Sequence, residues 1–363
     1  GLLIINVIAG FKIAKATHRL WSPLRRKVVP RILTKIPELS LLLLLTIIAY
    51  AYVEYAAVVG NTPIGSSLSS VDMIVLSFVI SMAIAIIAVI AGVGGGVIFT
   101  PIMLAFTSID TLVIRSTGLV VAMFSGLVST GPFMRKGLAD VKIVFFGALP
   151  IIIGGLGGAF AAIILARYLG ETGDAIVRLL LGVTLVMIAL LFIFSGSNNE
   201  YPQTDKFDTF GNDLKLRNTY WEESLNTYVR YRAVNVKLGG VLFFVVGFTG
   251  GFFGLGGGWA VVPVLNLVMA VPLKVSAASS GVLLAMGNAA AIWPYINAGA
   301  LIGLVAAPWM LGQVIGGIIG AHILVSIKAG FVRNLLIILL LLTSVKLMVR
   351  GLETLLSIDI PIF

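Results

Sequence analysis

The sequence has no cysteine and only two histidines, His18 and His322, in 363 residues. A chain without thiols forms no disulfide, iron–sulfur cluster or thiolate zinc site, and two histidines disfavour a haem or a multi-histidine metal centre. We therefore expect no cofactor and no metal. Charged residues are also scarce, at 11%, whereas 59% of the residues are hydrophobic and the mean hydropathy is +1.10. This composition lies outside the soluble globular range and predicts an all-α polytopic membrane protein.

The longest apolar segments lack the alternation of apolar and polar residues that a β-barrel needs. Residues 39–59 and 71–91 are apolar throughout most of their length, which is typical of membrane-spanning helices and disfavours a transmembrane barrel. No apolar stretch with a small-residue cleavage site precedes Leu39, so we expect no cleavable signal peptide.

Acidic residues are missing from the start of the chain, where eight of the 25 basic residues precede Glu38. A basic run of this kind can bind nucleic acid. Here it is interleaved with apolar residues such as Ile8, Phe11 and Trp21, and it leads into an apolar helix. An interfacial helix on an anionic cytoplasmic leaflet explains these features better, so we expect the lipid bilayer, and no nucleic acid, as a partner.

Apolar runs separated by turn or charge signals mark the expected helices. They fall at residues 39–59, 71–91, 97–107, 113–131, 143–167, 176–195, 237–254, 259–270, 276–293, 300–325 and 331–350. Between the two groups, residues 196–233 carry six acidic and five basic residues. This stretch is expected to be a solvated linker with one short helix around residues 221–230.

The second group of apolar segments repeats the first with a shift of 162 residues, which slips by one residue near Gly118 and Gly281. A register held over this length indicates an internal duplication rather than the general glycine content of membrane helices. The shift places Gly92, Gly94, Gly95 and Gly96 on Gly254, Gly256, Gly257 and Gly258, Pro101 on Pro263, Pro132 on Pro294, Gly137 on Gly299, and Gly154–Gly155 on Gly316–Gly317.

The basic residues predict how the two repeats are oriented, because cytoplasmic loops carry an excess of Lys and Arg. If the glycine-broken units, residues 71–107 and 237–270, each enter and leave on one face, then the linker, Lys142 and Lys274 are all cytoplasmic. If each unit instead crossed once, Arg135 would lie outside. We therefore expect two inverted repeats, each with a glycine-broken re-entrant helical unit, although Lys346 and Arg350 then fall near the outer face.

The expected protein is a multi-pass protein of the plasma membrane with a cytoplasmic N-terminus, and a homodimer is left open. Its parts are a basic interfacial segment with an extra transmembrane helix (1–60), transmembrane repeat 1 (71–195), a cytoplasmic polar linker (196–233), transmembrane repeat 2 (234–350) and a short tail (351–363).

The glycine stretches are the first candidate binding site. Each directly precedes a short apolar helix, so its glycines would form an N-terminal turn with free N–H groups and the positive end of the helix dipole. Two such turns facing each other suit an anion. Close helix packing is the alternative for a single glycine stretch. The candidates are Gly94, Gly95, Gly96, Gly256, Gly257 and Gly258.

A few polar side chains accompany the glycines. The pairs Ser116–Thr117 and Ser279–Ser280 correspond in the two repeats and could donate to an oxyanion or bond to their own helix carbonyls. Arg115 could attract an anion or snorkel to the interface, and we favour snorkelling. Asn288 is a further candidate ligand, and interhelical hydrogen bonding is the alternative for it and for Gln313.

Carboxylates are nearly missing from the predicted membrane core, where Glu54 near an interface is the exception. A proton relay built on buried Asp or Glu therefore has no obvious residue. Coupling could be absent, could use His322, which we favour as a helix cap, or could use the protonation of the substrate itself. The run Trp293-Pro294-Tyr295 is typical of an aromatic belt rather than a gate.

The paired glycine signature gives the chain a family resemblance over roughly residues 75–195 and 235–350. It resembles the sulfite exporter TauE/SafE family, also grouped as the four-toluene-sulfonate uptake permease family. The matching residues are Gly92–Gly96 with Pro101, Gly254–Gly258 with Pro263, the pairs Ser116–Thr117 and Ser279–Ser280, and the loop Arg135-Lys136-Gly137 with Asp140.

The resemblance implies export or uptake of small sulfur-containing anions such as sulfite or sulfonates. Inverted repeats with interrupted helices are typical of secondary transporters with a site at the midplane, so the sequence predicts an alternating-access exporter and not an enzyme. An anion channel of the same architecture is the nearest alternative. An intramembrane hydrolase using a serine with His322 is disfavoured, because the sequence has no G-x-S-x-G or H-E-x-x-H motif.

Overall fold

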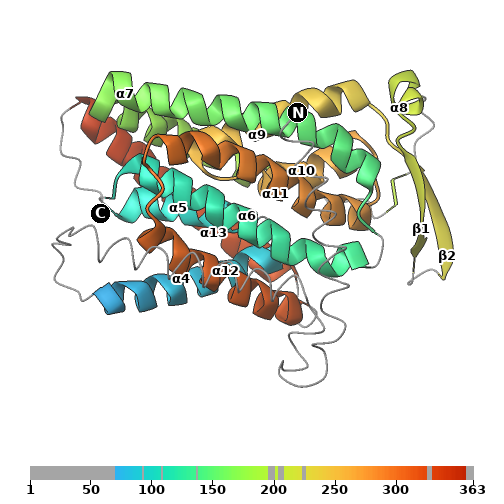
Figure 1. Cartoon of the computed structure of the whole chain (residues 1–363), viewed down its shortest axis with the longest axis horizontal. Coiled ribbons are helices and arrows are strands. Elements are labelled where there is room, and N and C mark those ends of the chain that lie inside the picture. Colours follow the sequence, from blue (N-terminus) through green and yellow to red (C-terminus); the bar gives the residue numbers. More distant parts are fainter. Residues whose placement is uncertain are drawn as a thin grey trace. The chain divides into compact units, whose positions relative to one another are not determined.

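The computed structural model describes residues 70–91, 94–107, 109–135, 138–194, 201–202, 208–222, 226–324 and 329–356 (Figure 1). The predicted segment of residues 1–60, with His18 and Glu54, lies outside this part of the chain. The described helices are α4 (Ser70–Ala91), α5 (Gly95–Phe106), α6 (Thr111–Arg135), α7 (Val141–Phe194), α8 (Thr209–Asp213), α9 (Val236–Phe253), α10 (Gly258–Pro263), the π-helical turn η2 (Val264–Val268), α11 (Leu273–Asn297), α12 (Gly303–Leu324) and α13 (Ala329–Leu356), and the strands are β1 (Arg217–Glu222) and β2 (Thr227–Arg232).

Each apolar run of the sequence in this part of the chain is helical, as predicted. The runs 143–167 and 176–195 form the two arms of one element, α7, which meet at Gly170. This residue has φ 48° and ψ −126°, a conformation that glycine adopts readily because it has no Cβ. The two arms are therefore separate helices joined by a sharp kink at Gly170, as the two predicted runs require.

The predicted helix around residues 221–230 is wrong. The described residues of this range belong to the antiparallel strands β1 and β2, in which Trp221 pairs with Tyr228. Burial alternates along the strands, with Tyr220 and Tyr231 inward and the Trp221–Tyr228 pair outward. The two-residue period and the aromatic side chains favour strands, and they outweigh the high charge content on which the linker prediction rested.

The β-hairpin is attached to the beginnings of two helices. The Tyr231 hydroxyl donates to Asp140 Oδ2 (2.5 Å), and Asp140 Oδ1 accepts the backbone N–H of Lys142 (2.9 Å) where α7 begins. Burial and the hydrogen bond to Asp140 raise the pKa of Tyr231 above its ordinary value, which keeps the phenol a donor. On the other strand, Glu222 pairs with Lys274 at the start of α11 (Oε1···Nζ 2.5 Å).

We expect Tyr231→Phe to lower the free energy of unfolding by about 1–3 kcal/mol, because it leaves a buried oxygen of Asp140 without its donor. Tyr228→Phe is the matched control, since Tyr228 is 68% exposed on the outer face of the same hairpin. Thermal unfolding of the purified protein in detergent measures both variants. Equal losses in the two variants would contradict a structural role for the Tyr231–Asp140 bond.

Helices that precede the linker pack against helices that follow it. The first helix of one group lies along a later helix of the other, α4 along α12 and α9 along α7, and α6 packs against α11 (Figure 1). Gly154 approaches the backbone of Phe244 and Phe248, and Gly158 that of Phe248 and Phe252. Because both residue numbers increase together, α7 and α9 run in the same direction.

Helices α6 and α11 run in opposite directions. Ser116, near the start of α6, bonds to the carbonyl of Ala300 just after α11 (3.0 Å). At the other end, the N–H of Asp140, just after α6, donates to Ser279 Oγ near the start of α11 (3.1 Å). The central helices of the two groups are thus antiparallel.

The segment from α9 to η2 is a helical hairpin. The Val234 N–H donates to the Met269 carbonyl and the Asn235 amide donates to the Val268 carbonyl, both at 3.0 Å, so the chain returns to the level at which α9 begins. The returning arm, Gly258–Val268, is about 16 Å long at 1.5 Å per residue, roughly half the hydrocarbon thickness of a bilayer. With 12 residues, α5 is about 18 Å long by the same rule.

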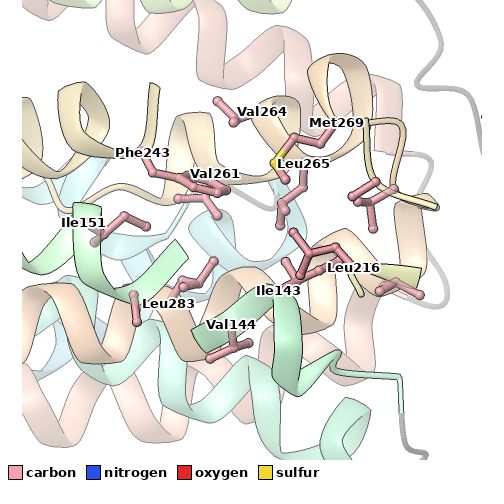
Figure 2. Packing of buried hydrophobic residues seen from close by; sticks show 14 of the residues in the cluster. Ile143, Val144, Ile151, Leu216, Phe243, Val261, Val264, Leu265, Met269 and Leu283 are labelled. Carbon is pink, nitrogen blue, oxygen red and sulfur yellow. The ribbon is translucent and has the colours of Figure 1, made fainter. Parts of the chain in front are cut away.

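Apolar side chains from four helices and the linker form one large buried cluster. Figure 2 shows Ile143, Phe243, Val261 and Leu283 of α7, α9, α10 and α11 packed together, with Leu216 of the linker beside them. The linker therefore contributes to the same core as the helices, which fixes the hairpin of α9 and η2 against α7 and α11.

The outer faces of the helices are strongly apolar. Phe145 and Leu149 of α7 are 73% and 65% exposed, and apolar surface of this kind needs a lipid or protein cover. Within the described residues, four helices are long and apolar enough to cross a membrane: Thr111–Val128, Val141–Leu191, Val236–Phe253 and Leu273–Asn297. The chain is a multi-pass membrane protein.

Candidate binding site at the glycine junction

The two glycine stretches of the sequence lie against each other. A Cβ added to Gly94 would be 3.9 Å from the Cα of Gly258, and one added to Gly96 would be 2.5 Å from the carbonyl oxygen of Leu255. Residues 94–96 and 254–258 therefore form one site, which we name the glycine junction. It joins the two stretches that correspond to each other at the 162-residue shift.

Both halves of the glycine junction begin helices that have no side-chain cap. The N-cap residues are Gly94 for α5 and Gly257 for α10, and neither first turn contains an acidic residue. The Gly95 N–H donates to Ser125 Oγ of α6 (3.2 Å). Two uncapped N-termini thus meet in a buried place, where their N–H groups and dipoles favour negative charge.

The side-chain amides of Gln313 and Asn288 lie against the glycine junction. A Cβ on Gly95 would overlap Gln313 Oε1 of α12, and one on Gly256 (φ +67°) would lie 3.0 Å from Asn288 Nδ2 of α11. These glycines are needed because a side chain in either position would displace the amide. The close approach brings one polar group from each of α11 and α12 to the backbone of the junction.

Three polar atoms of side chains around the junction have no hydrogen-bond partner in the described part of the chain: Asn288 Nδ2, Gln313 Oε1 and Trp259 Nε1. Asn288 is 5% exposed and Gln313 is fully buried. A buried donor or acceptor without a partner costs about 1–3 kcal/mol and is rare in native proteins. A polar ligand or a buried water could supply the missing partners.

Asn288 lines a small cavity beside the junction. Its other walls are apolar or glycine, among them Ile151, Gly257 and Leu284, and its volume is about 10 Å³. That is room for about one water molecule, so an oxyanion requires the surrounding helices to move apart. As it stands in the structure, the cavity is too small for an oxyanion.

The predicted hydroxyl ligands are bonded to backbone groups. Thr117 donates to the Val113 carbonyl (2.8 Å) and Ser280 to the Ala277 carbonyl (2.9 Å), which is back-bonding within a helix. Ser116 and Ser279 bond across helices at the two ends of the α6–α11 pair, as described above. Their role as substrate ligands stays a prediction, and the bonds seen here hold the helices together.

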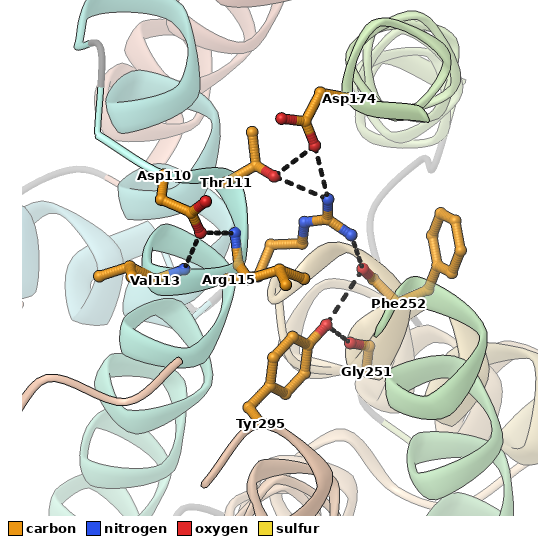
Figure 3. A network of polar contacts seen from close by, with 9 residues as sticks. Asp110, Thr111, Val113, Arg115, Asp174, Gly251, Phe252 and Tyr295 are labelled. Carbon is orange, nitrogen blue, oxygen red and sulfur yellow. Dashed lines mark hydrogen bonds and ion pairs between the residues drawn. The ribbon is translucent and has the colours of Figure 1, made fainter. Parts of the chain in front are cut away.

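The predicted snorkelling of Arg115 is wrong, because the side chain is fully buried. It pairs with Asp174 Oδ1 (3.6 Å) and donates to Thr111 Oγ1 (3.1 Å) and to the Phe252 carbonyl (3.4 Å) (Figure 3). The Tyr295 hydroxyl donates to the Gly251 carbonyl (2.8 Å). A guanidinium and a phenol thus bind the last carbonyls of α9, where the helix dipole favours positive charge.

Several residues of this region were missed in the sequence. Asp174 follows the bend of α7 and lies between the predicted spans, so nothing linked it to Arg115. Thr100, whose hydroxyl donates to the Gly254 carbonyl (2.8 Å), joins the two glycine stretches. Ser125 could have been found, since the shift that matches Ser116 with Ser279 places it on Asn288.

Other predicted residues gave mixed outcomes. Gln313 donates to the Ser81 carbonyl of α4 (3.2 Å), which confirms interhelical hydrogen bonding. Trp293 is 60% exposed, which is compatible with an aromatic belt, whereas Tyr295 is fully buried. His322 lies in the last turn of α12, and its side chain is outside the described atoms.

Comparison with known proteins places most of the chain in one family. Residues 77–347 match the family model described as Sulfite exporter TauE/SafE. A curated relative, "Probable membrane transporter protein YunE" of Bacillus subtilis (strain 168), is 26% identical over 292 residues, which cover 76% of this chain and 99% of the relative. No solved structure matches the chain. The matched range contains both halves of the glycine junction.

Proposed function

The chain belongs to the sulfite exporter TauE/SafE family of membrane transporters, and we propose that it is a secondary transporter that exports a small sulfur-containing anion, such as sulfite or an organosulfonate. The observation that carries this proposal is the meeting of two uncapped helix N-termini at the glycine junction. The substrate, the direction and the transport mechanism are the proposed parts.

In this proposal the anion binds at the glycine junction, between the first turns of α5 and α10. Backbone N–H groups of residues 96 and 258, the Asn288 amide and the dipoles of the two helices stabilise it. The proposed donors are neutral N–H groups rather than a buried lysine. Neutral donors suit a transport site, because it must release the anion on either side of the membrane. Each additional N–H donor to a charged oxygen contributes about 1.5–3 kcal/mol.

We further propose that the helices form two inverted repeats that rock against each other to give alternating access. The antiparallel α6–α11 pair and the crosswise packing of α4 on α12 and of α9 on α7 support this arrangement. The hairpin of α9 and η2 is the proposed re-entrant unit of the second repeat. Because the cavity at Asn288 is small, opening to either side requires such a rearrangement.

The proposed location is the plasma membrane, with the N-terminus and the linker on the cytoplasmic face. The support is the placement of basic residues at one end of the bundle: the Lys142 Nζ bonds to the linker carbonyl of Lys215, and Lys274 pairs with Glu222. An excess of basic residues on one face is typical of the cytoplasmic side.

Counterflow in proteoliposomes tests the proposed function. We expect labelled sulfite to accumulate transiently in vesicles preloaded with unlabelled sulfite, with uptake that saturates. Saturation with counterflow identifies a transporter, whereas linear flux without counterflow would identify a channel and overturn the proposal. A thermal-shift screen of sulfite, sulfate, thiosulfate and sulfonates on the purified protein then ranks the substrates.

A further inference from the structure

Gln313 is a buried hydrogen-bond acceptor whose orientation is fixed. Its Nε2 donates to the backbone carbonyl of Ser81 (3.2 Å), and a carbonyl oxygen only accepts. The amide therefore cannot exchange its nitrogen and oxygen without losing this bond. Oε1 is turned towards Gly95 at the glycine junction and has no hydrogen-bond partner among the described residues.

Asn288 offers the opposite group, an unpartnered donor. Its Nδ2 approaches Gly256 from α11, and the side chain lines the small cavity of the junction. The N–H groups of the two helix N-termini are donors as well. A ligand that satisfies all of these groups needs several acceptor oxygens and, in addition, one hydrogen on an oxygen for Gln313.

We propose that the glycine junction selects the monoprotonated form of an oxyanion, hydrogen sulfite in the case of sulfite, and that Gln313 Oε1 accepts the ligand's O–H. This inference rests on the proposed function and narrows its substrate to an oxyanion that carries an O–H, so a sulfonate without a hydroxyl is not expected to be a substrate. A dianion, or a monoanion without an O–H, leaves Gln313 Oε1 buried and unpaired. Sites built to bond a substrate hydroxyl reject analogues that lack it, and we expect at least about tenfold weaker binding.

Among the described side chains of the helices around Gln313, the charged one is Arg115 of α6. Helix α12 packs against α4 and α6. On α6, Arg115 is bound to Asp174, and Arg135 is the last residue of the helix. Asp72 lies in the first turn of α4, and His322 is nine residues further along α12, about 13 Å from Gln313. In this proposal the group that titrates at the junction is the substrate.

Transport of a monoprotonated anion has a direct consequence for coupling. Each anion carries its own proton across the membrane, so no carboxylate relay is needed in the membrane core. The scarcity of acidic residues in the apolar spans is consistent with this arrangement.

The test measures binding of sulfite and of methanesulfonate to the purified full chain by calorimetry or thermal shift. Measurements are made about one pH unit below and about one pH unit above the second pKa of sulfurous acid, where the ratio of monoanion to dianion is about tenfold each way. Methanesulfonate is a monoanion without an O–H at both pH values, so it reports any effect of pH on the protein itself. We expect sulfite to bind about tenfold more tightly at the lower pH, and methanesulfonate to bind weakly and equally at both.

Two variants separate the acceptor from the donor. Gln313→Met removes the acceptor and should abolish the pH preference for sulfite while leaving methanesulfonate binding unchanged. Asn288→Leu removes a donor and should weaken both probes at both pH values. If Gln313→Met does not fold, the pH comparison on the unmodified chain still decides.

The outcomes distinguish this inference from the proposed function. Sulfite that binds equally at both pH values, or better at the higher one, overturns the selection of the monoprotonated form and leaves the transporter proposal standing. A Gln313→Met variant that keeps the pH preference overturns the role of Gln313. Failure of both probes to bind at either pH, together with absent counterflow, overturns both proposals.

Discussion

Gly257→Leu is expected to give a folded protein whose sulfite transport is at least about 100-fold slower than that of the unmodified chain, about 2.7 kcal/mol. Gly257 has φ −100°, which any residue adopts. An added Cβ would meet Val246 Cγ1 at 2.9 Å and Leu284 Cδ2 at 3.2 Å, the ends of flexible side chains that can shift. The leucine is larger than the cavity beside Asn288, so it would fill this space and displace its walls in front of the first turn of α10.

Counterflow measures this loss, and size-exclusion chromatography with thermal unfolding shows whether the variant folds. Gly157→Leu is the matched control, because a Cβ there would lie 3.8 Å from its nearest neighbour, Phe248, on the exposed face of α7. Gly256 is unsuitable for the test, since its φ of +67° strains any other residue. A folded Gly257→Leu protein that transports normally would place the substrate site elsewhere.

The contact between the two glycine stretches could be expected from the sequence, because glycines and prolines have the same spacing in both repeats. Glycines and prolines recur at one shift, and each glycine stretch opens a short helix before Pro101 or Pro263. Backbone breaks are costly in a membrane unless they are buried or bonded, so two breaks in register point to a shared site. The structure adds that the breaks meet through backbone contacts such as Gly96 with Leu255.

The side chains around the glycine junction could not be identified in the same way. Gly95 and Gln313 are 218 positions apart, and their contact depends on how α12 is rotated about its axis. Helices that are apolar on all faces give no periodic signal for that rotation. The β-hairpin was missed for a different reason, because charge content was given more weight than the alternation seen at Tyr220 and Tyr231.

Loss of Asp174 is expected to destabilise the protein more than loss of its partner Arg115. Arg115 is fully buried, whereas the side chain of Asp174 is 29% exposed (Figure 3). Asp174→Ala leaves a buried guanidinium without its counter-charge and should lower the free energy of unfolding by about 3–5 kcal/mol. Arg115→Leu leaves a carboxylate that reaches water and still accepts the Thr111 hydroxyl, so its loss should be smaller.

The double variant Arg115→Leu/Asp174→Ala completes the cycle. It should be more stable than Asp174→Ala alone, because replacing both partners of a buried ion pair removes the uncompensated charge. Glu171→Ala, at an exposed acid near the same bend of α7, is the control and should change stability little. Thermal unfolding of all four variants measures the coupling, and strict additivity of the two single losses would contradict the ion pair. Arg115 also binds the Phe252 carbonyl. In the double variant the Gly251 and Phe252 carbonyls at the end of α9 keep Tyr295 as their side-chain donor among the described residues, so we expect transport still to be lost.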